Sequence, residues 1–300
     1  MASAKSGILN IDKPQGLTSH DVVARVRRLM GTRRVGHAGT LDPLATGVLL
    51  VCVGTATRVV EYLQKGRKIY ETTVRLGQAT NTYDADGEIT AENPVPDFDL
   101  ATLEQALDAF RGEILQTPPI YSAIKKNGQP LYKLARAGQQ VVIPTRKVTI
   151  HALEILSWQN PELRLRITSS PGTYIRSIAH DVGQALGVGG HVQCLRRVAS
   201  GSWRVEDAVS LETLQAESGD LERYLHGLRG ALSMLPPVVL TAELAYRFTL
   251  GQRVPLAQAP AQVTDLRVLG PGERFLGIGR MKGTVLAPHK VFASPKKFNS

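Results

Sequence analysis

A single acidic residue stands among glycines and small apolar residues in the segment Gly36-His37-Ala38-Gly39-Thr40-Leu41-Asp42-Pro43-Leu44-Ala45-Thr46-Gly47-Val48-Leu49. Glycine permits backbone conformations and close approaches that a Cβ atom would forbid, so such a loop can lie directly against a ligand. Pro43 fixes its own φ angle and restricts Asp42 to extended backbone. A carboxylate held in this way, just before a buried strand, is suited to act as a nucleophile or a general base. By residue type alone, an Asp that caps a turn is the competing interpretation.

The sequence around this segment predicts the elements that hold it. Residues 19–30 predict a helix opened by a Ser/Asp cap, and residues 47–53 predict a buried strand. Further elements are predicted as a short helix at 57–64, a strand with one solvated face at 69–76, an amphipathic helix at 100–110, paired strands at 148–158 and 163–169, and a helix at 174–186. Strands and helices mix without a regular βαβ repeat. This favours an α+β domain with a mixed, mostly antiparallel sheet over a doubly wound fold.

Three other kinds of site do not fit the sequence. A nucleotide-phosphate loop needs a Gly-Lys-Ser/Thr ending or a GxGxxG motif after a strand, and neither is present. The seven histidines are scattered, and His180-Asp181 lacks a second histidine four residues on, so no metal site is predicted. No GxSxG segment offers a serine nucleophile.

The composition is that of a folded protein with a substantial core: 300 residues, of which 43% are hydrophobic and 21% charged. No run approaches the roughly 20 apolar residues of a membrane span, and the first residues contain no apolar signal segment. Cys52 and Cys194 are the only cysteines and form no CxxC pair, which argues against a disulfide framework. We therefore expect a soluble protein of the reducing cytoplasm.

The formal net charge of +10 suits a polyanionic partner, because Lys and Arg side chains release counterions from phosphates when they bind. The charge is also segregated along the chain. Residues 84–110 hold eight acidic residues and no Lys or Arg, whereas residues 111–147 hold seven basic residues and one acidic. Residues 236–300 hold nine basic residues and three acidic. Two basic regions favour a nucleic acid, and solubility alone is the simpler alternative.

Two stretches rich in Pro and Gly divide the chain. Residues 115–147 contain prolines and glycines among their charges and predict an extended, partly irregular insertion, which in other proteins is usually functional or mobile. After Pro236-Pro237, short strand-like pieces at 266–269, 275–278 and 284–287 predict a small β domain. We therefore expect a main domain over residues 1–235 and a small one over residues 236–300.

The segment from Gly36 to Leu49 resembles the signature of the bacterial tRNA pseudouridine synthase B family. Other blocks resemble motifs of this family in the same order along the chain. These are Ile11-Asp12-Lys13-Pro14-Gln15-Gly16, Lys68-Ile69-Tyr70-Glu71, Arg75-Leu76-Gly77 with Asp84-Ala85-Asp86-Gly87, Tyr121-Ser122-Ala123-Ile124-Lys125, Leu131-Tyr132-Lys133-Leu134-Ala135-Arg136, Gly172-Thr173-Tyr174-Ile175-Arg176-Ser177-Ile178 and Leu195-Arg196-Arg197. The resemblance spans residues 7–204, and the C-terminal residues 275–279 and 286–288 resemble the family's tail.

The resemblance implies a pseudouridine synthase fold over residues 1–235, with an RNA-gripping insertion at about 115–147 and a C-terminal RNA-binding domain that resembles a PUA module. It implies isomerisation of uridine to pseudouridine in the T-loop of tRNA, at the position numbered 55. The expected enzyme is a monomer with no cofactor, metal or obligate protein partner. A stacked uracil must be flipped out of the RNA to reach a protein carboxylate, at a cost of about a few kcal/mol.

The same resemblance implies roles for individual residues. Asp42 is the expected nucleophile, attacking either the ribose C1′ or the uracil C6, and Arg176 is expected to pair with it and keep it ionised. Tyr70 is expected to stack on the uracil, which is worth roughly 1 to 3 kcal/mol. Contacts with the flipped nucleotide are expected from His37, Tyr174 and Leu195. Phosphate contacts are expected from Lys13, Lys125, Lys126, Lys133, Arg136, Arg146 and Lys147.

Two residues depart from the usual family pattern. Pro171 stands where the family commonly has lysine, and Ala38 stands where it commonly has threonine. Both leave the expected nucleophile in place and bear on RNA affinity. The alternative function is a chaperone or binding module that grips the T-arm without chemistry. It explains the charge equally well, but it does not explain an acidic residue in an apolar glycine loop.

Overall fold

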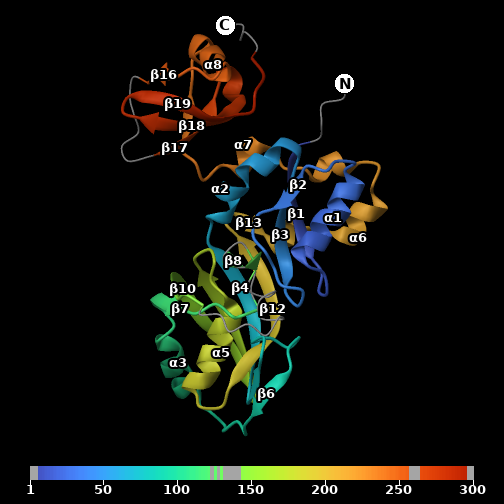
Figure 1. Cartoon of the computed structure of the whole chain (residues 1–300), viewed down its shortest axis with the longest axis vertical. Coiled ribbons are helices and arrows are strands. Elements are labelled where there is room, and N and C mark those ends of the chain that lie inside the picture. Colours follow the sequence, from blue (N-terminus) through green and yellow to red (C-terminus); the bar gives the residue numbers. More distant parts are fainter. Residues whose placement is uncertain (1–5, 122–124, 127–128, 131–142, 257–263, 296–300) are drawn as a thin grey trace.

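The computed structural model describes residues 6–121, 125–126, 129–130, 143–256 and 264–295. One long sheet runs through the main part of the molecule with helices packed against it, and the C-terminal residues form a smaller unit at one end (Figure 1). The predicted α+β class with a mixed, mostly antiparallel sheet is confirmed.

Ten strands form the main sheet. Eight of them follow one another in the order β14 (Val209–Ser210), β1 (Gly7–Lys13), β3 (Thr46–Val53), β12 (Gly190–Ser200), β4 (Lys68–Leu76), β11 (Glu162–Ser169), β10 (Arg146–Gln159) and β7 (Gly112–Gln116). The other two are β2 (Val35–His37), which pairs with β3, and β13 (Trp203–Arg204), which pairs with β12. The β1–β14 and β3–β12 pairs are parallel, and the remaining pairs are antiparallel.

Strand β12 joins the two halves of this sheet. It pairs with β4 along almost its whole length, but with β3 only where Arg196 faces Thr46 and Arg197 faces Gly47. Gly47 has a φ of +97°, and a Cβ atom there would lie 2.3 Å from the carbonyl oxygen of Arg197. Only glycine therefore allows β3 to approach β12 so closely. This contact brings the loop that precedes β3 to the middle of the sheet.

Two helices carry residues of the site. The predicted helix is α1 (Ser19–Leu29), which buries Val22 and Val26 on its apolar face. It begins after Thr18, which forms a capping box with Asp21, whereas the sequence predicted a Ser/Asp cap. Helix α5 (Ile175–Ala185) packs on the start of β12 through Gly183, where a Cβ atom would lie 2.2 Å from the next strand's first backbone nitrogen. Both helices therefore have fixed positions relative to the sheet.

The remaining elements of the main part are short. They are η1 (Gly54–Val59), α2 (Val60–Gln64), α3 (Leu100–Asp108), η2 (Val205–Asp207), α6 (Leu211–Ala216), η3 (Leu221–Tyr224), α7 (Leu228–Ala231), the pair β5 (Gln78–Thr80) and β6 (Ile89–Glu92), and the pair β8 (Lys125–Lys126) and β9 (Gln129–Pro130). The short helix predicted at 57–64 is thus a 3-10 turn followed by one turn of α-helix. In the part of the chain that the structure describes, no helix has the length and apolar character needed to cross a membrane.

The C-terminal unit is a five-stranded sheet covered by one helix. Its strands follow the order β15 (Pro237–Val239), β17 (Asp265–Leu269), β18 (Phe275–Lys282), β19 (Val285–Val291) and β16 (Val254–Pro255). The three strands predicted here are confirmed, although the third begins one residue later than expected. Helix α8 (Ala242–Thr249), which the sequence analysis did not predict, buries Phe248 against Leu266 and Leu276. The 3-10 turn η4 (Pro271–Glu273) links β17 to β18.

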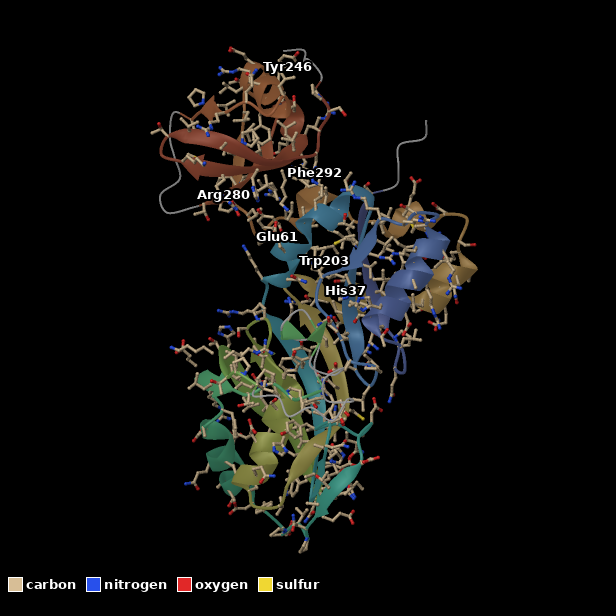
Figure 2. All side chains as sticks on the ribbon, viewed as in Figure 1. His37, Glu61, Trp203, Tyr246, Arg280 and Phe292 are labelled. Carbon is tan, nitrogen blue, oxygen red and sulfur yellow. The ribbon has the colours of Figure 1, made fainter. Side chains whose placement is uncertain are left out.

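The C-terminal unit docks on η1 and α2 through charged and aromatic side chains. The Arg58 Nη1 donates a hydrogen bond to the Val291 carbonyl at 2.7 Å, and its guanidinium lies 4.6 Å from the centre of the Phe292 ring. The Lys290 Nζ lies 2.6 Å from a Glu61 carboxylate oxygen. Figure 2 labels Glu61 and Phe292 at this junction.

Candidate active site

The loop between β2 and β3 holds Asp42 by its main chain. The Leu41 N–H donates to the Ser19 Oγ at 2.8 Å, and this hydroxyl donates back to the Leu41 carbonyl at 3.1 Å. On the other side, the Gly16 N–H donates to the Pro43 carbonyl at 2.8 Å. The residues before and after Asp42 are therefore both fixed to neighbouring elements.

A buried arginine ties the first half of the same loop to β3. Arg197 is 2% exposed, and its guanidinium donates hydrogen bonds to the carbonyls of Gly39 at 3.1 Å, Thr40 at 3.3 Å and Val48 at 2.7 Å. Bonds from a charged donor to several carbonyls are stronger than neutral ones. Arg197 therefore holds the loop in one conformation from the β12 side.

Lys13, from which a phosphate contact is expected, holds the second half of the loop with its side chain. Its side chain is fully buried, and its Nζ donates to the carbonyls of Pro14 at 2.8 Å, Leu17 at 2.7 Å and Pro43 at 3.3 Å. Burial lowers the pKa of Lys13 to about 8. An ammonium enclosed by three carbonyls serves the protein backbone and is not presented to an RNA phosphate.

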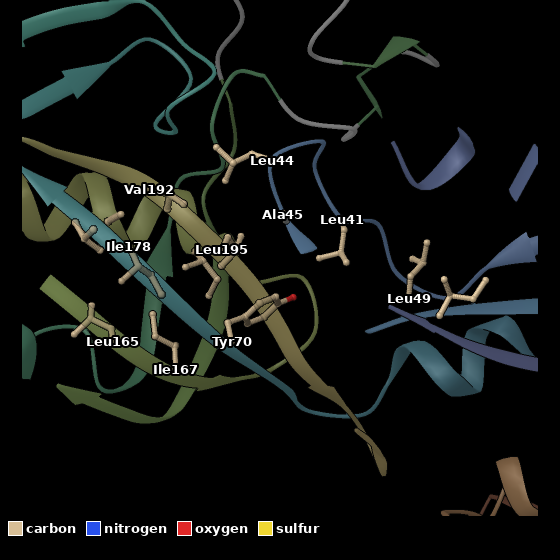
Figure 3. Close-up of a cluster of buried hydrophobic side chains, with 14 of the residues drawn as sticks. Leu41, Leu44, Ala45, Leu49, Tyr70, Leu165, Ile167, Ile178, Val192 and Leu195 are labelled. Carbon is tan, nitrogen blue, oxygen red and sulfur yellow. The ribbon is translucent and has the colours of Figure 1, made fainter. Parts of the chain in front are cut away.

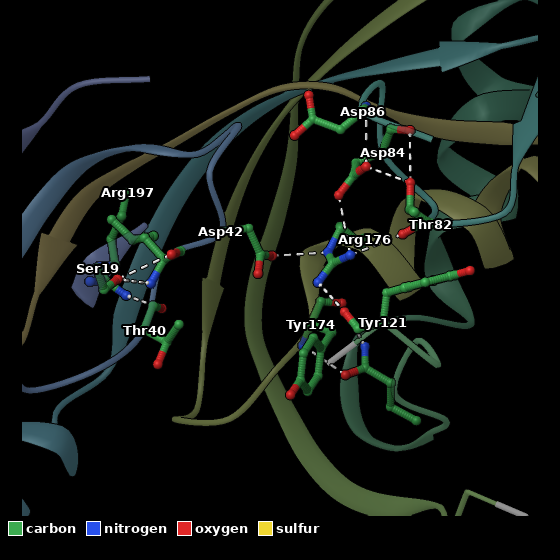
Figure 4. Close-up of polar contacts among 12 residues, drawn as sticks. Ser19, Thr40, Asp42, Thr82, Asp84, Asp86, Tyr121, Tyr174, Arg176 and Arg197 are labelled. Atoms are coloured by element: carbon green, nitrogen blue, oxygen red, sulfur yellow. Dashed lines mark hydrogen bonds and ion pairs between the residues drawn. The ribbon is translucent and has the colours of Figure 1, made fainter. Parts of the chain in front are cut away.

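Asp42 and Asp84 share one guanidinium (Figure 4). Arg176, in the first turn of α5, places its Nε 2.9 Å from a carboxylate oxygen of Asp42 and its Nη1 3.2 Å from one of Asp84. The same Nη1 donates to the Thr82 carbonyl at 3.0 Å, and Nη2 donates to the Tyr121 carbonyl at 3.0 Å. All three nitrogens of this buried guanidinium thus have an oxygen within contact distance, which fixes its position.

The environment raises the pKa of Asp42. Burial is the largest cause, the Arg176 guanidinium opposes it, and the negative charge of Asp84 adds to it. Arg176 therefore lowers the pKa of Asp42, as expected, but burial raises it by more. The side chain of Asp42 is nevertheless 35% exposed, so its carboxylate can be reached from solvent.

That carboxylate lies in a cavity of about 320 Å³. Five of the predicted site residues line the cavity together: Asp42, Tyr70, Tyr174, Arg176 and Leu195. Tyr70 on β4 and Leu195 on β12 come from neighbouring strands and lie beside each other, facing the loop residue Leu41 (Figure 3). The cavity therefore combines apolar and aromatic surface with one carboxylate, Asp42, and three cationic side chains, Lys68, Arg176 and Arg197, which suits a flat polar ring.

His37 does not line this cavity. Its ring stands edge-on to that of His20, with 5.2 Å between the ring centres, and no described residue forms a hydrogen bond with its buried Nδ1. Burial lowers the pKa of His37 to about 4, so the imidazole is neutral at neutral pH. The structure thus separates His37 from the other predicted site residues.

The basic residues expected to contact phosphates occupy different surroundings. The Arg146 guanidinium lies 4.5 Å from the centre of the Tyr174 ring, and its buried Nε and Nη2 have no hydrogen-bond partner among the described residues. The Lys147 Nζ lies 2.8 Å from a Glu113 carboxylate oxygen on the exposed edge of the sheet. Lys125 and Lys126 form β8, but their side chains, like all of Lys133 and Arg136, lie outside the described residues.

Three residues of the site, Asp84, Arg197 and Lys68, were not predicted from the sequence. Asp84 belongs to an acidic stretch far along the chain from Arg176, and no local pattern singles it out. Lys68 lines the cavity, and burial lowers its pKa to about 8. All three residues lie within sequence blocks that resemble motifs of the family, and this was the one indication that they could belong to the site. The resemblance did not assign a role to any of them.

The described residues form no second centre that competes with this cavity. Among the residues that the structure describes, no three His, Cys, Asp or Glu side chains are grouped so that they could hold a metal ion. A wider and more open surface cavity of about 440 Å³ lies near Arg75, Asn93 and Asn160, away from Asp42 and Arg176. It contains no carboxylate paired with a buried cation.

Three family profiles match the chain in succession. "TruB family pseudouridylate synthase (N terminal domain)" matches residues 27–175, "tRNA pseudouridylate synthase B C-terminal domain" matches residues 176–233, and "Pseudouridine synthase II TruB, C-terminal" matches residues 236–292. Together they cover most of the chain.

Curated proteins are similar over nearly the full length. A protein of Cupriavidus pinatubonensis named tRNA pseudouridine synthase B is 44% identical over 296 residues, which cover 95% of this chain and 93% of the relative. A Pseudomonas aeruginosa protein of the same name is 44% identical and covers 96% of each chain. Among solved structures, one described as an H/ACA RNP bound to a substrate RNA containing 2′-deoxyuridine has a TM-score of 0.75 at 25% identity, covering 99% of this chain and 88% of the other. A Cbf5-Nop10-Gar1 complex has a TM-score of 0.74 at 27% identity, with 97% and 86% covered.

Proposed function

This chain belongs to the TruB family of pseudouridylate synthases, and we propose that Asp42 is the residue with which it attacks uridine in tRNA. The fold is the pseudouridine synthase fold, and the C-terminal unit is consistent with a PUA-like domain. The enzyme isomerises uridine: the bond between N1 and C1′ breaks, a bond between C5 and C1′ forms, and the proton lost from C5 is balanced by one gained at N1.

The observation that carries the role of Asp42 is its place in the cavity. It is the carboxylate among the described lining residues, it is partly exposed, and a buried guanidinium lies 2.9 Å away. A nucleophile needs this combination of access and fixed orientation. Attack at the ribose C1′ and attack at the uracil C6 both begin from such a position.

Tyr70 and Leu195 provide the surface on which we propose that the flipped uracil rests. A flipped base loses its stacking on neighbouring bases, and an aromatic platform restores part of that energy, roughly 1 to 3 kcal/mol. Tyr174 bounds the same cavity. His37, which lies outside the cavity lining, is proposed to contact RNA next to the flipped nucleotide or to fill the space that it leaves.

Arg176 is proposed to orient Asp42 during the attack. Its charge favours the ionised carboxylate, which is the nucleophilic form, against the opposing effect of burial. When the carboxylate bonds to carbon, its negative charge is lost and the guanidinium stays held by Asp84. The arginine therefore does not have to move during the step.

We propose the T-loop, at the position numbered 55, as the target, with phosphates held by the basic insertion. Arg146 lies beside the cavity, with its guanidinium 4.5 Å from the centre of the Tyr174 ring, and its positive charge there supports a phosphate contact. Lys147, Lys125, Lys126, Lys133 and Arg136 are proposed as further contacts. The proposed domains are residues 1–235 for catalysis and 236–300 for RNA binding.

One chain supplies every side chain that this proposal uses, so we propose a monomer without an obligate partner or cofactor. A cytoplasmic location is part of the proposal because tRNA is modified there. The alternative, a module that binds the T-arm and only assists its folding, would have no use for a partly exposed carboxylate in the cavity.

The test uses a T-arm hairpin whose uridine at position 55 alone carries tritium at C5. Wild type and a control, Asp207→Asn on the exposed surface, are expected to release the label, whereas Asp42→Asn is expected to bind the hairpin and release none. Release by Asp42→Asn would refute the nucleophile assignment. Binding by wild type without release would favour the module without chemistry, and release only from other labelled uridines would refute the target position.

A further inference from the structure

Asp84, the second carboxylate on Arg176, follows a residue with an uncommon backbone. Tyr83 has a φ of +64°, a left-handed conformation that few aromatic residues adopt. Its carbonyl accepts a hydrogen bond from the Val192 N–H at 3.0 Å, and the Ala85 N–H donates to the Val192 carbonyl at 2.9 Å. A left-handed turn at a bulky side chain persists only where its surroundings hold it. The loop is therefore strained just where it presents Asp84.

The side chain of Tyr83 is held by His180. The two rings are stacked, with 3.9 Å between their centres and 13° between their planes. The His180 Nδ1 is buried and has no hydrogen-bond partner within the part of the chain that the structure describes. Burial lowers the pKa of this histidine, which favours the neutral ring. What the imidazole offers to the loop is its flat face.

His180 and Arg176 lie four residues apart in α5, on the same face of the helix. Arg176 binds the Thr82 carbonyl and the Asp84 carboxylate, and His180 stacks on Tyr83 between them. Three consecutive loop residues are thus held by two side chains one helical turn apart. The same guanidinium also contacts the Asp42 carboxylate, at 2.9 Å.

We propose that His180 is a positioning residue for the isomerisation: its ring holds the strained turn at Tyr83, which presents Asp84 to Arg176 and so fixes the guanidinium that orients Asp42. This rests on the proposed role of Asp42. Without the stack, the turn at Tyr83 relaxes, the Asp84 carboxylate turns away, and Arg176 loses one of its two anionic anchors. His180 acts through these neighbours and not on the RNA.

The test measures single-turnover tritium release with enzyme in excess over tRNA. His180→Ala is expected to be about tenfold slower, a rise of about 1.4 kcal/mol in activation free energy. His180→Phe keeps a flat ring and is expected to return to within about threefold of wild type. Tyr83→Gly can adopt the left-handed backbone, so it is expected to fold. It has no ring for His180 to hold, and glycine leaves the turn free to take other conformations, so it is expected to be about as slow as His180→Ala.

The matched control is His226→Ala, which removes an edge-on contact between His226 and Trp203, whose ring centres are 4.8 Å apart. It is expected to keep the wild-type rate. Binding is measured with each substitution added to Asp42→Asn, so that no turnover intervenes, and the Kd is expected to stay within about twofold. A loss of rate at constant Kd, restored by Phe, is not what general destabilisation produces.

Three results would overturn the positioning role. These are a His180→Ala rate equal to that of His226→Ala, a His180→Phe rate as low as that of His180→Ala, and a full rate for Tyr83→Gly. If His180→Ala does not fold, the single-turnover rates of His180→Phe and Tyr83→Gly still test the positioning role. If the single variant Asp42→Asn released tritium, the assignment of Asp42 as the nucleophile would be wrong. If Asp42→Asn were inactive and His180→Ala fully active, only the positioning role of His180 would be refuted.

Discussion

Burial and neighbouring charges shift the pKa of Asp42 in opposite directions. Burial and the Asp84 carboxylate raise its pKa, while Arg176 and Lys13 lower it. The reaction needs the ionised form, so activity should rise with pH as Asp42 loses its proton. Changing one neighbour at a time should therefore move the acidic limb of the pH profile in a direction set by that neighbour's charge.

Asp84→Asn should move the acidic limb to lower pH. Removing the negative charge lowers the pKa of Asp42, because one of the causes that raise it is gone. The plateau rate should also fall, by about tenfold to a hundredfold, because Arg176 is no longer held at two carboxylates. The single-turnover rate measured as a function of pH checks both effects. A limb that stays in place or moves to higher pH would contradict the account.

Lys13→Met should move the acidic limb to higher pH, because the positive charge of Lys13 lowers the pKa of Asp42. The shift should be smaller than that of Asp84→Asn, because Lys13 affects this pKa less than Asp84 does. The variant also leaves three carbonyls without their donor, which should cost about 1 to 3 kcal/mol of unfolding free energy.

The stability difference between wild type and Lys13→Met should depend on pH. The pKa of Lys13 is about 8 in the folded state, below its ordinary 10.5, so between these pH values the folded state holds fewer protons than the unfolded state. The stability of wild type relative to the variant should therefore grow as pH rises from about 8 to 10.5. If urea unfolding over that range showed no such growth, burial would not lower the pKa of Lys13, and the folded protein would keep it as an ammonium.

At the level of elements, two glycines place the site. Gly47 lets β3 meet β12, and Gly183 lets α5 lie on the start of β12. The first contact positions the loop of Asp42, and the second positions Arg176. The distance between the two charged groups is therefore set by how closely three elements pack.

Gly183→Ala should disturb the second contact. The added Cβ would lie 2.2 Å from the Gly190 nitrogen, and relieving this overlap should cost about 1 to 3 kcal/mol of stability. The rate should fall as well, since Arg176 lies on the helix that must move. Gly230→Ala in α7, where nothing lies within 4 Å of the new atom, is the control and should stay within about 0.5 kcal/mol of wild type. Equal stability of the two variants by urea unfolding would refute this role of Gly183.

The sequence was sufficient for the elements with a regular apolar pattern and for the loop of Asp42, whose glycines and proline lie next to it. It was insufficient for β12. That strand buries Arg197 in its middle, and a pattern that assigns charged residues to the surface hides such a strand. The pairing of Asp84 with Arg176 was also out of reach, because only the packing of α5 brings these distant residues together.

Across the whole molecule, the excess positive charge is divided between the two units. The C-terminal unit has a recess of about 280 Å³ lined by the basic side chains Arg253, Arg280, Lys282 and His289. One of these, Arg280, is already paired with Asp265 at 2.7 Å. Arg253 and Lys282 are therefore the side chains from which phosphate contacts are expected.

Arg253→Gln combined with Lys282→Gln should weaken tRNA binding without slowing the chemical step. Each lost phosphate contact should reduce the slope of log Kd against log salt by about one. Filter binding at several salt concentrations measures the slope, and single-turnover release at saturating enzyme measures the step. An unchanged slope would remove this recess from the RNA interface, and a slower step at saturation would mean that it acts on catalysis.

The central claim is that Asp42 performs the attack. Its most direct measurement is the single-turnover rate of tritium release from tRNA by Asp42→Asn, with the Kd for the same tRNA measured in parallel. The account predicts a Kd close to that of wild type and no measurable release, because an amide of nearly the same shape keeps the cavity but is not a nucleophile. Release at a rate near that of wild type, at an unchanged Kd, would contradict it.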